Sequence, residues 1–239
     1  MTIPVPRGTL LNTVTVALGA TLGLALGAHI SPSVERLAMD ALGLVTCGIG
    51  IRMIVKARDM VTVAVAIVVG GLLGLAIGIP EGIERFAEWA KLLLGGQGNF
   101  TEAIVAPSVL FVVGPVTLLG CIQDAVERKI ELLAIKSTMD GVAAIFFAMS
   151  LGPGVLVSAA VVLVFQGLLT LFARPLAPMA QDAEMLDELS GAGGVIMLAI
   201  GLSLLSLKSI PTAAFLPALA LAPLIVVWRR KWGRRSASD

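Results

Sequence analysis

The side chains that could bind an ion or exchange a proton are concentrated in one stretch, residues 114–141, between long apolar segments. Within it, Lys136 and Asp140 are four residues apart, so on a helix they share a face and can neutralise each other. Asp124 follows Thr117 at a spacing that places both on one stripe of another helix. Carboxylates with neutral oxygen neighbours, and no cluster of soft ligands, suit a hard cation such as Na⁺ or H⁺. The pattern therefore favours ion binding.

Neutral polar residues complete the set of candidate ligands, which we take to be Asn12, Thr117, Gln123, Ser137 and Gln166. Asn12 and Gln166 lie inside apolar segments, where each could instead hydrogen-bond between helices for about 1 kcal/mol. Lys136 could reach the membrane surface with its long side chain, and Asp140 could be an interfacial cap. For Asp140 the functional interpretation is favoured, because a carboxylate inside a membrane is costly. For Asp124, next to a loop, the two interpretations are balanced.

Four positions are predicted to act as hinges or helix breaks: Gly114, Pro115, Gly120 and Gly141. Proline removes a backbone donor from a helix, and glycine loosens the helix around it. A broken helix beside carboxylates is how secondary transporters build ion sites near the middle of the membrane.

The composition predicts a membrane protein. Of the 239 residues, 57% are hydrophobic and only 14% are charged, and the mean hydropathy is +0.98. Soluble domains carry about 25% charged residues. The net charge of +1 and the absence of tyrosine argue against nucleic acid as a partner. Neither a Ser/His pair, a carboxylate pair nor an HExxH motif is present, and Cys47 and Cys121 lack metal-site spacing. We therefore expect no enzyme activity, no metal site and no cofactor.

Eight segments are long and apolar enough to cross a bilayer as helices, which predicts an all-α, polytopic transmembrane bundle. They are roughly residues 9–29, 36–55, 60–79, 102–123, 130–152, 154–173, 190–207 and 212–228. The purely apolar part of the fifth, 141–152, is only about 18 Å long, so it needs Lys136 and Asp140 to cross about 30 Å. The expectation is therefore at least one broken or short span, with Asp140 inside the membrane.

The distribution of basic residues predicts the orientation. With the N-terminus inside, 13 of the 17 Lys and Arg residues fall on the cytoplasmic side, and eight spans return the C-terminus to that side. We expect one transmembrane domain over residues 1–228 and a basic cytoplasmic tail over 229–239. Within the domain, the charged and apolar alternation at 80–94 predicts an amphipathic helix at the membrane interface.

An internal similarity suggests an inverted repeat. Residues 43–54 resemble residues 194–205 after a shift of 151 positions, and the spans that follow begin in register. The two similar segments lie in the second and the seventh span, which cross the membrane in opposite directions. A repeat of spans 1–3 in spans 6–8 would therefore be inverted. Inverted repeats are common in secondary transporters.

The motifs GTLLNT, GPVTLLGCIQD, KSTMDG and QGLLT together resemble the YqgA/YdfK-like family of bacterial inner-membrane proteins, a domain of unknown function numbered 554. The resemblance runs from Gly8 to about Pro223, although the family usually has an Asn where this chain has Ala-Ala-Phe before Leu216. It implies a polytopic membrane protein in the plasma membrane and a general association with transport. It offers motif positions without roles, namely Gln123, Asp124, Lys136, Ser137, Asp140 and Gln166.

The sequence thus predicts a secondary transporter of a small ion or small polar solute, coupled to Na⁺ or H⁺. Two alternatives stay open: a passive channel, and a membrane scaffold or sensor subunit that transports nothing. The expected surroundings are a lipid bilayer, an unidentified small ion or solute and, compatible with the sequence, further copies of the chain.

Overall fold

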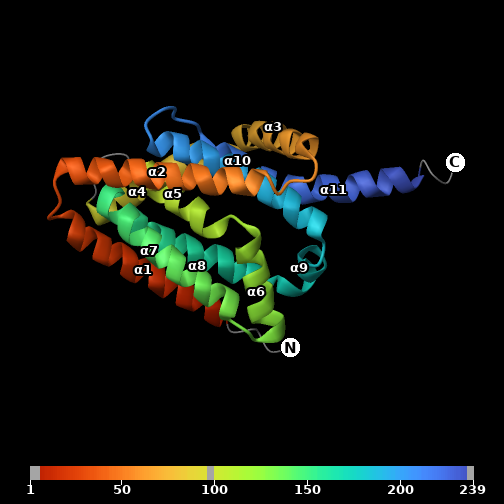
Figure 1. The fold of residues 1–239 in the computed structure, drawn as a ribbon, viewed down its shortest axis with the longest axis horizontal. Coiled ribbons are helices and arrows are strands. Elements are labelled where there is room, and N and C mark those ends of the chain that lie inside the picture. The colour runs from red at the N-terminus through yellow and green to blue at the C-terminus, as the bar shows by residue number, and fades with distance from the viewer. Residues whose placement is uncertain (1–5, 96–99, 236–239) are drawn as a thin grey trace.

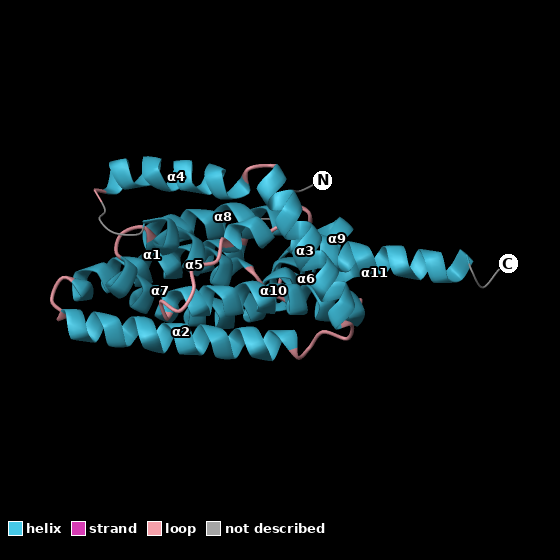
Figure 2. Ribbon diagram, turned by 90° about the horizontal axis from the view of Figure 1, so that it is seen from above, coloured by secondary structure: helices cyan, strands magenta, loops and turns pink. Residues whose placement is uncertain are grey.

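The computed structural model describes residues 6–95 and 100–235, and this part of the chain is helical without strands (Figure 2). Long apolar runs interrupted by Gly, Pro and short polar turns account for this pattern. The described residues form the α-helices α1 (Arg7–Gly27), α2 (Pro32–Ile54), α3 (Met60–Ala76), α4 (Ile79–Leu94), α5 (Phe100–Val112), α6 (Pro115–Glu127), α7 (Glu131–Leu151), α8 (Val155–Leu171), α9 (Ala173–Ala180), α10 (Ala183–Leu204) and α11 (Ala218–Arg235), and the 3₁₀ helix η1 (Thr212–Phe215).

The predicted all-α, membrane-spanning architecture is confirmed. Within the described ranges, 5 helical segments are long and apolar enough to cross a membrane, and there are up to 8 spans if each bent pair counts as one. The bent pairs are α3 with α4 (59°), α5 with α6 (60°) and α8 with α9 (83°). The predicted inverted repeat stays a prediction.

Glycines at helix crossings fix the relative directions of the main helices. A Cβ on Gly19 would collide with the carbonyl oxygen of Gly141, and one on Gly23 with that of Ile145, so α1 and α7 run parallel. The corresponding contacts of Gly43 with Gly201 and of Gly50 with Gly194 make α2 and α10 antiparallel. Figure 1 shows α1 beside α7 along one edge of the bundle. These directions agree with eight alternating spans, in which the first and fifth run the same way.

The predicted break at Gly114 and Pro115 is present. α5 ends at Val112 and α6 begins at Pro115, with Gly114 between them at φ 136°, a conformation that favours glycine. Proline suits the first turn of α6 because the amide hydrogen it lacks would have no partner there. Figure 1 shows α6 turning across the end of the bundle where the N-terminus lies.

The predicted breaks at Gly120 and Gly141 are wrong. Gly120 lies inside α6, and α7 continues through Gly141 without interruption. Both glycines serve packing instead, because a Cβ at Gly120 would press on Leu133 and one at Gly141 would press on Thr15. The fifth span is therefore a continuous helix of 21 residues.

The amphipathic segment expected over 80–94 is present as helix α4, which begins after Gly78 at φ 71°. Figure 2 shows α4 along one edge of the bundle. Its position relative to the membrane interface stays a prediction. At the other end of the chain, α11 continues as far as Arg235, so the first part of the predicted tail over 229–239 is helical and projects from the bundle (Figure 1).

Candidate functional site

Asp140 lies in the middle of α7, away from solvent. Only 5% of the residue is exposed, and Lys136, one turn earlier, is 9% exposed. The Lys136 ammonium donates to Oδ2 of Asp140 at 2.5 Å. The predicted i, i+4 pair is therefore formed, and it lets both charges stay inside the bundle as a neutral unit.

Asn12 brings α1 into the site. Its side chain is fully buried, and Nδ2 donates to Asp140 Oδ2 at 2.9 Å. Because α1 approaches α7 closely at Gly19 and Gly141, the Asn12 side chain can reach Asp140. The other amide atom, Oδ1 of Asn12, is buried and has no hydrogen-bond partner among the described residues. It is an acceptor without a donor.

Gln166 and Thr117 meet at the break between α5 and α6. Both are fully buried, and both donate to the carbonyl oxygen of Phe111, Gln166 through Nε2 and Thr117 through Oγ1, each at the long distance of 3.5 Å. Phe111 is in the last turn of α5, where carbonyl groups lose their helical partners. Oε1 of Gln166 is a second buried amide oxygen with no partner in the described structure.

The helices α1 and α8 place the two unpaired amide oxygens at a similar depth. Thr9 and Thr170 face each other at 3.3 Å, and the two helices run in opposite directions. One turn further along α1 is Asn12, and one turn back along α8 is Gln166, so both lie on the same side of the threonine pair. Asn12 contacts Asp140, and Gln166 contacts the Phe111 carbonyl.

Asp124 has a different environment from Asp140. It is 4% exposed, and its Oδ2 accepts a hydrogen bond of 2.8 Å from the backbone nitrogen of Gly8, in the first turn of α1. The carboxylate therefore satisfies an amide that has no partner within its own helix. This contact fixes the start of α1 on α6.

The remaining predicted ligands are less directly involved. Ser137 is 2% exposed, but its hydroxyl donates to the Leu133 carbonyl of its own helix at 2.6 Å. Gln123 is half-buried near the end of α6, and its Oε1 has no partner among the described residues. The residues of α1, α6, α7 and α8 that are buried in this region form what we call the buried polar core: Thr9, Asn12, Thr117, Cys121, Asp124, Lys136, Ser137, Asp140, Gln166 and Thr170.

Three members of this core, Thr9, Cys121 and Thr170, are not among the predicted site residues. Thr9 lies one turn before Asn12 on the same face of α1, a spacing that could have identified it. Cys121, for which the sequence predicts no metal binding, is fully buried in α6. The core thus contains hydroxyls and a thiol in addition to the predicted groups.

Glu188 is a buried carboxylate that is not among the predicted site residues. It is fully buried in α10, and its Oε1 accepts hydrogen bonds from the backbone nitrogens of Arg58 at 3.1 Å and Asp59 at 2.8 Å. The seventh span was predicted to begin at residue 190, but α10 begins at Ala183, because Asp182 caps it by accepting from the Met185 amide. Glu188 therefore lies within the helix and not in a loop.

Charged residues surround this position and form a second group, the terminal charge cluster, which consists of Arg58, Asp59, Asp182, Glu184, Asp187, Arg229 and Arg230. Arg229 bonds to Asp59 at 2.5 Å and also to Glu184. Arg230 bonds to Asp182 and Glu184. These pairs tie α11 to α10 and to the start of α3.

The buried polar core offers oxygen ligands and no assembled metal site. Among the described residues, no three His, Cys, Asp or Glu side chains lie close enough to hold a metal ion. His29 is exposed at the end of α1, where its ring bonds to the Ala25 carbonyl. The core therefore combines the Asp140 carboxylate, paired with an ammonium, the Asp124 carboxylate, bonded to a backbone amide, and two unpaired amide oxygens beside a helix break.

Comparisons with known proteins identify the family. Residues 7–227 match the model described as "Protein of unknown function (DUF554)". The chain is 26% identical to "Uncharacterized membrane protein YdfK" of Bacillus subtilis (strain 168) over 232 residues, which cover 95% of this chain and 99% of that one. It is 29% identical to "Uncharacterized protein YqgA" of Escherichia coli (strain K12) over 228 residues, 92% and 97% of the two chains. No solved structure matches. The chain is a membrane protein that belongs to the DUF554 family.

Proposed function

We propose that this protein is a secondary transporter that moves a small cation, or a small polar solute together with Na⁺ or H⁺, by alternating access. The observation that carries the proposal is the buried polar core beside the α5–α6 break. Four helices supply it, and Asn12 and Gln166 each contribute a fully buried oxygen without a donor. Buried polar atoms in native proteins are nearly always paired, so the two unpaired acceptors on the neighbouring helices α1 and α8 are candidate ligands for a cation.

The available atoms favour a hard cation. The Asp140 carboxylate, the amide oxygens of Asn12 and Gln166 and the Phe111 carbonyl are all oxygen ligands, which suit Na⁺ or a proton rather than a soft metal. The carbonyl end of α5 also carries the negative end of a helix dipole. A cation near this break would therefore meet favourable charge from both the helix end and the carboxylate.

Lys136 would act as a tethered competitor for the transported cation. Its ammonium occupies Oδ2 of Asp140, so an entering cation has to replace it or share the carboxylate with it. Replacement keeps the charge of the core balanced only if Lys136 turns away or loses its proton. This exchange gives the two states that alternating access requires, with the break at Gly114 and Pro115 as the hinge.

The orientation in the cell belongs to this proposal. The excess of basic residues on one side favours both termini in the cytoplasm, and the resemblance places the chain in the bacterial inner membrane. We further propose that the chain is not an enzyme, because the buried polar core contains one thiol and no histidine that could activate it.

The test is reconstitution in liposomes, with Na⁺- or H⁺-driven uptake of small ions and solutes measured for the native chain and for Asp140→Asn and Gln166→Leu. We expect each variant to reduce uptake at least tenfold. Glu127→Gln is the matched control, because it makes the same carboxylate-to-amide change at an exposed residue of α6 and should leave uptake unchanged.

Three results would contradict the proposal. If both variants took up ions or solutes as fast as the native chain, the buried polar core would not be part of the transport path. Flux that does not saturate and ignores ion gradients would identify a channel. A scaffold or sensor would show no uptake in the native chain, and Asp140→Asn would leave its function intact while its capture of a partner changed.

A further inference from the structure

The outer face of α2 is unusually bare for a helix of a bundle. Only 17% of the most apolar segment of α2 is buried inside the chain, compared with 28% to 67% of the corresponding segments of the other four long spans. Its inner face packs on the core through Met39, Leu42, Ile49 and Met53. The opposite face is an exposed stripe that we call the α2 stripe: Leu37, Asp40, Ala41, Leu44, Val45, Gly48, Ile51 and Arg52.

If Arg52 lies near one surface of the membrane, Asp40 cannot lie at the opposite surface. The two residues are separated by about 18 Å along the helix axis, whereas the hydrocarbon is about 30 Å thick. Arg52 can extend its long side chain to the surface, but Asp40 has a short one. With Arg52 at one surface, the carboxylate of Asp40 would lie at hydrocarbon depth, where an ionisable group requires a partner.

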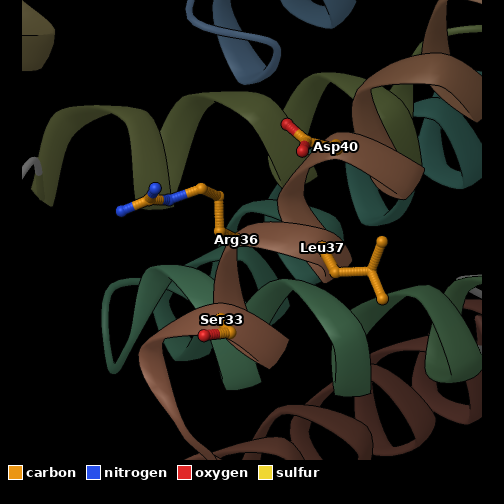
Figure 3. A pocket seen from close by; sticks show the side chains of 4 residues that line it. All are labelled: Ser33, Arg36, Leu37 and Asp40. Carbon is orange, nitrogen blue, oxygen red and sulfur yellow. The ribbon is translucent and has the colours of Figure 1, made fainter.

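None of the described residues of its own chain forms an ion pair with the Asp40 carboxylate. Asp40 lines a shallow hollow of about 280 Å³ together with Ser33, Arg36 and Leu37, all from α2. Figure 3 shows the Arg36 guanidinium extended to the left, with its charged end apart from the Asp40 carboxylate. No ion pair of either residue occurs in the described part of the chain.

We propose that the α2 stripe, together with the exposed Arg36 at its edge, is the interface of a homodimer, in which Arg36 of each copy pairs with Asp40 of the other. A two-fold axis along the membrane normal makes the two α2 helices parallel, with Arg36 and Asp40 about 6 Å apart in depth, a distance that an arginine side chain spans. The two charges are opposite in sign and one turn apart, so the surface is complementary to itself. Gly48 has no atom of its own chain within 4 Å of an added Cβ, which leaves room for a neighbouring helix.

The decisive experiment measures the mass of the protein in detergent and the number of subunits per particle in vesicles. The native chain should be a dimer. Asp40→Arg and Arg36→Asp should each weaken the dimer at least tenfold, and the combined swap should restore it. Asp40→Asn and Arg36→Gln should weaken it in the same direction, and a melting temperature close to the native value shows that each variant folds.

Cross-linking locates the interface independently. With Cys47 and Cys121 replaced by serine, Leu44→Cys on the α2 stripe should form a covalent dimer on oxidation, whereas Val164→Cys on α8 should not. The two native residues are equally exposed, at 64% and 61%. A monomeric native chain, a dimer that survives both single reversals, or equal cross-linking at the two positions would overturn the proposal. Loss of bound anionic lipid from a monomer on Arg36→Gln would also overturn it, and would make the hollow a lipid site.

Discussion

The buried polar core and the terminal charge cluster hold their charges in opposite ways. In the core, Asp140 has one charged partner, Lys136, and the neighbouring amides retain unpaired oxygens. In the cluster, Arg229 and Arg230 each contact two carboxylates, and the arginine side chains are more than 40% exposed. Water and salt weaken the exposed pairs, whereas the buried pair has no solvent to replace a lost partner.

One carboxylate in the core and one beside the cluster accept hydrogen bonds from the backbone at the start of a helix. Asp124 accepts from Gly8 at the beginning of α1, and Glu188 accepts from Arg58 and Asp59 just before α3. These two carboxylates position helices. Asp140 accepts only from side chains, and side chains can move without unfolding a helix. The side-chain contacts of Asp140 can therefore be exchanged for others, whereas the contacts of Asp124 and Glu188 are fixed by the backbone.

The largest predicted effect comes from removing Lys136. Lys136→Met leaves a carboxylate buried without a counter-charge, and we expect a loss of about 3–5 kcal/mol in stability. Adding Asp140→Asn should recover most of it, because the asparagine can still accept from Asn12 and carries no charge. Denaturation in detergent micelles measures the stability of the single and of the double variant.

Lys129→Met is the control for that pair, since Lys129 is exposed and 3.3 Å from an exposed Glu127. It should change stability by less than about 0.5 kcal/mol. If Lys136→Met were as mild as this control, Asp140 would be reached by water or another partner. The contrast between the core and the cluster would then fail.

Sequence patterns predicted the parts of this comparison that depend on neighbours along the chain. The Lys136–Asp140 pair follows from a spacing of four residues on one helix, and the break at Gly114 follows from the proline beside it. Gly141 looked equally fit for a break, but it serves the contact with α1. A glycine looks the same in a sequence whether it loosens its own helix or allows a second helix to pack closely against it.

Contacts between distant helices could not be predicted in this way. The bond from Asn12 to Asp140 joins residues 128 positions apart and depends on how closely α1 approaches α7. Glu188 was overlooked for a different reason. The predicted span began only at residue 190, since acidic residues lower the hydropathy there, although Asp182 starts the helix earlier.

A smaller effect is predicted for Glu188. Glu188→Leu removes the acceptor of two backbone amides, and we expect a loss of about 2–4 kcal/mol in stability. Glu188→Gln keeps one acceptor oxygen and should cost less than about 1 kcal/mol. Thermal unfolding in detergent distinguishes the two. A glutamine variant as unstable as the leucine variant would mean that the second oxygen, Oε2, also has a partner, and Glu188 would then resemble Asp140.

The smallest effect is expected at the edge of the terminal charge cluster. The hydrogen bond from Arg230 holds the pKa of Asp182 below its ordinary value. A lowered pKa means that the folded state favours the carboxylate, so this stabilisation is present above the unfolded pKa of about 3.9 and is lost as the pH falls through the folded value. Asp182→Asn retains a good cap for α10 but removes the charge, and should lower the Tm at pH 7 by at most about 3 °C.

The pH dependence separates the charge of Asp182 from its capping role. The difference in Tm between the native chain and Asp182→Asn should shrink as the pH falls below about 4, because the native residue becomes neutral as well. A difference that stayed constant with pH would show that capping alone determines the effect. The exposed pairs would then contribute nothing measurable to stability, and the buried Lys136–Asp140 pair would be the one ion pair of this comparison on which stability depends.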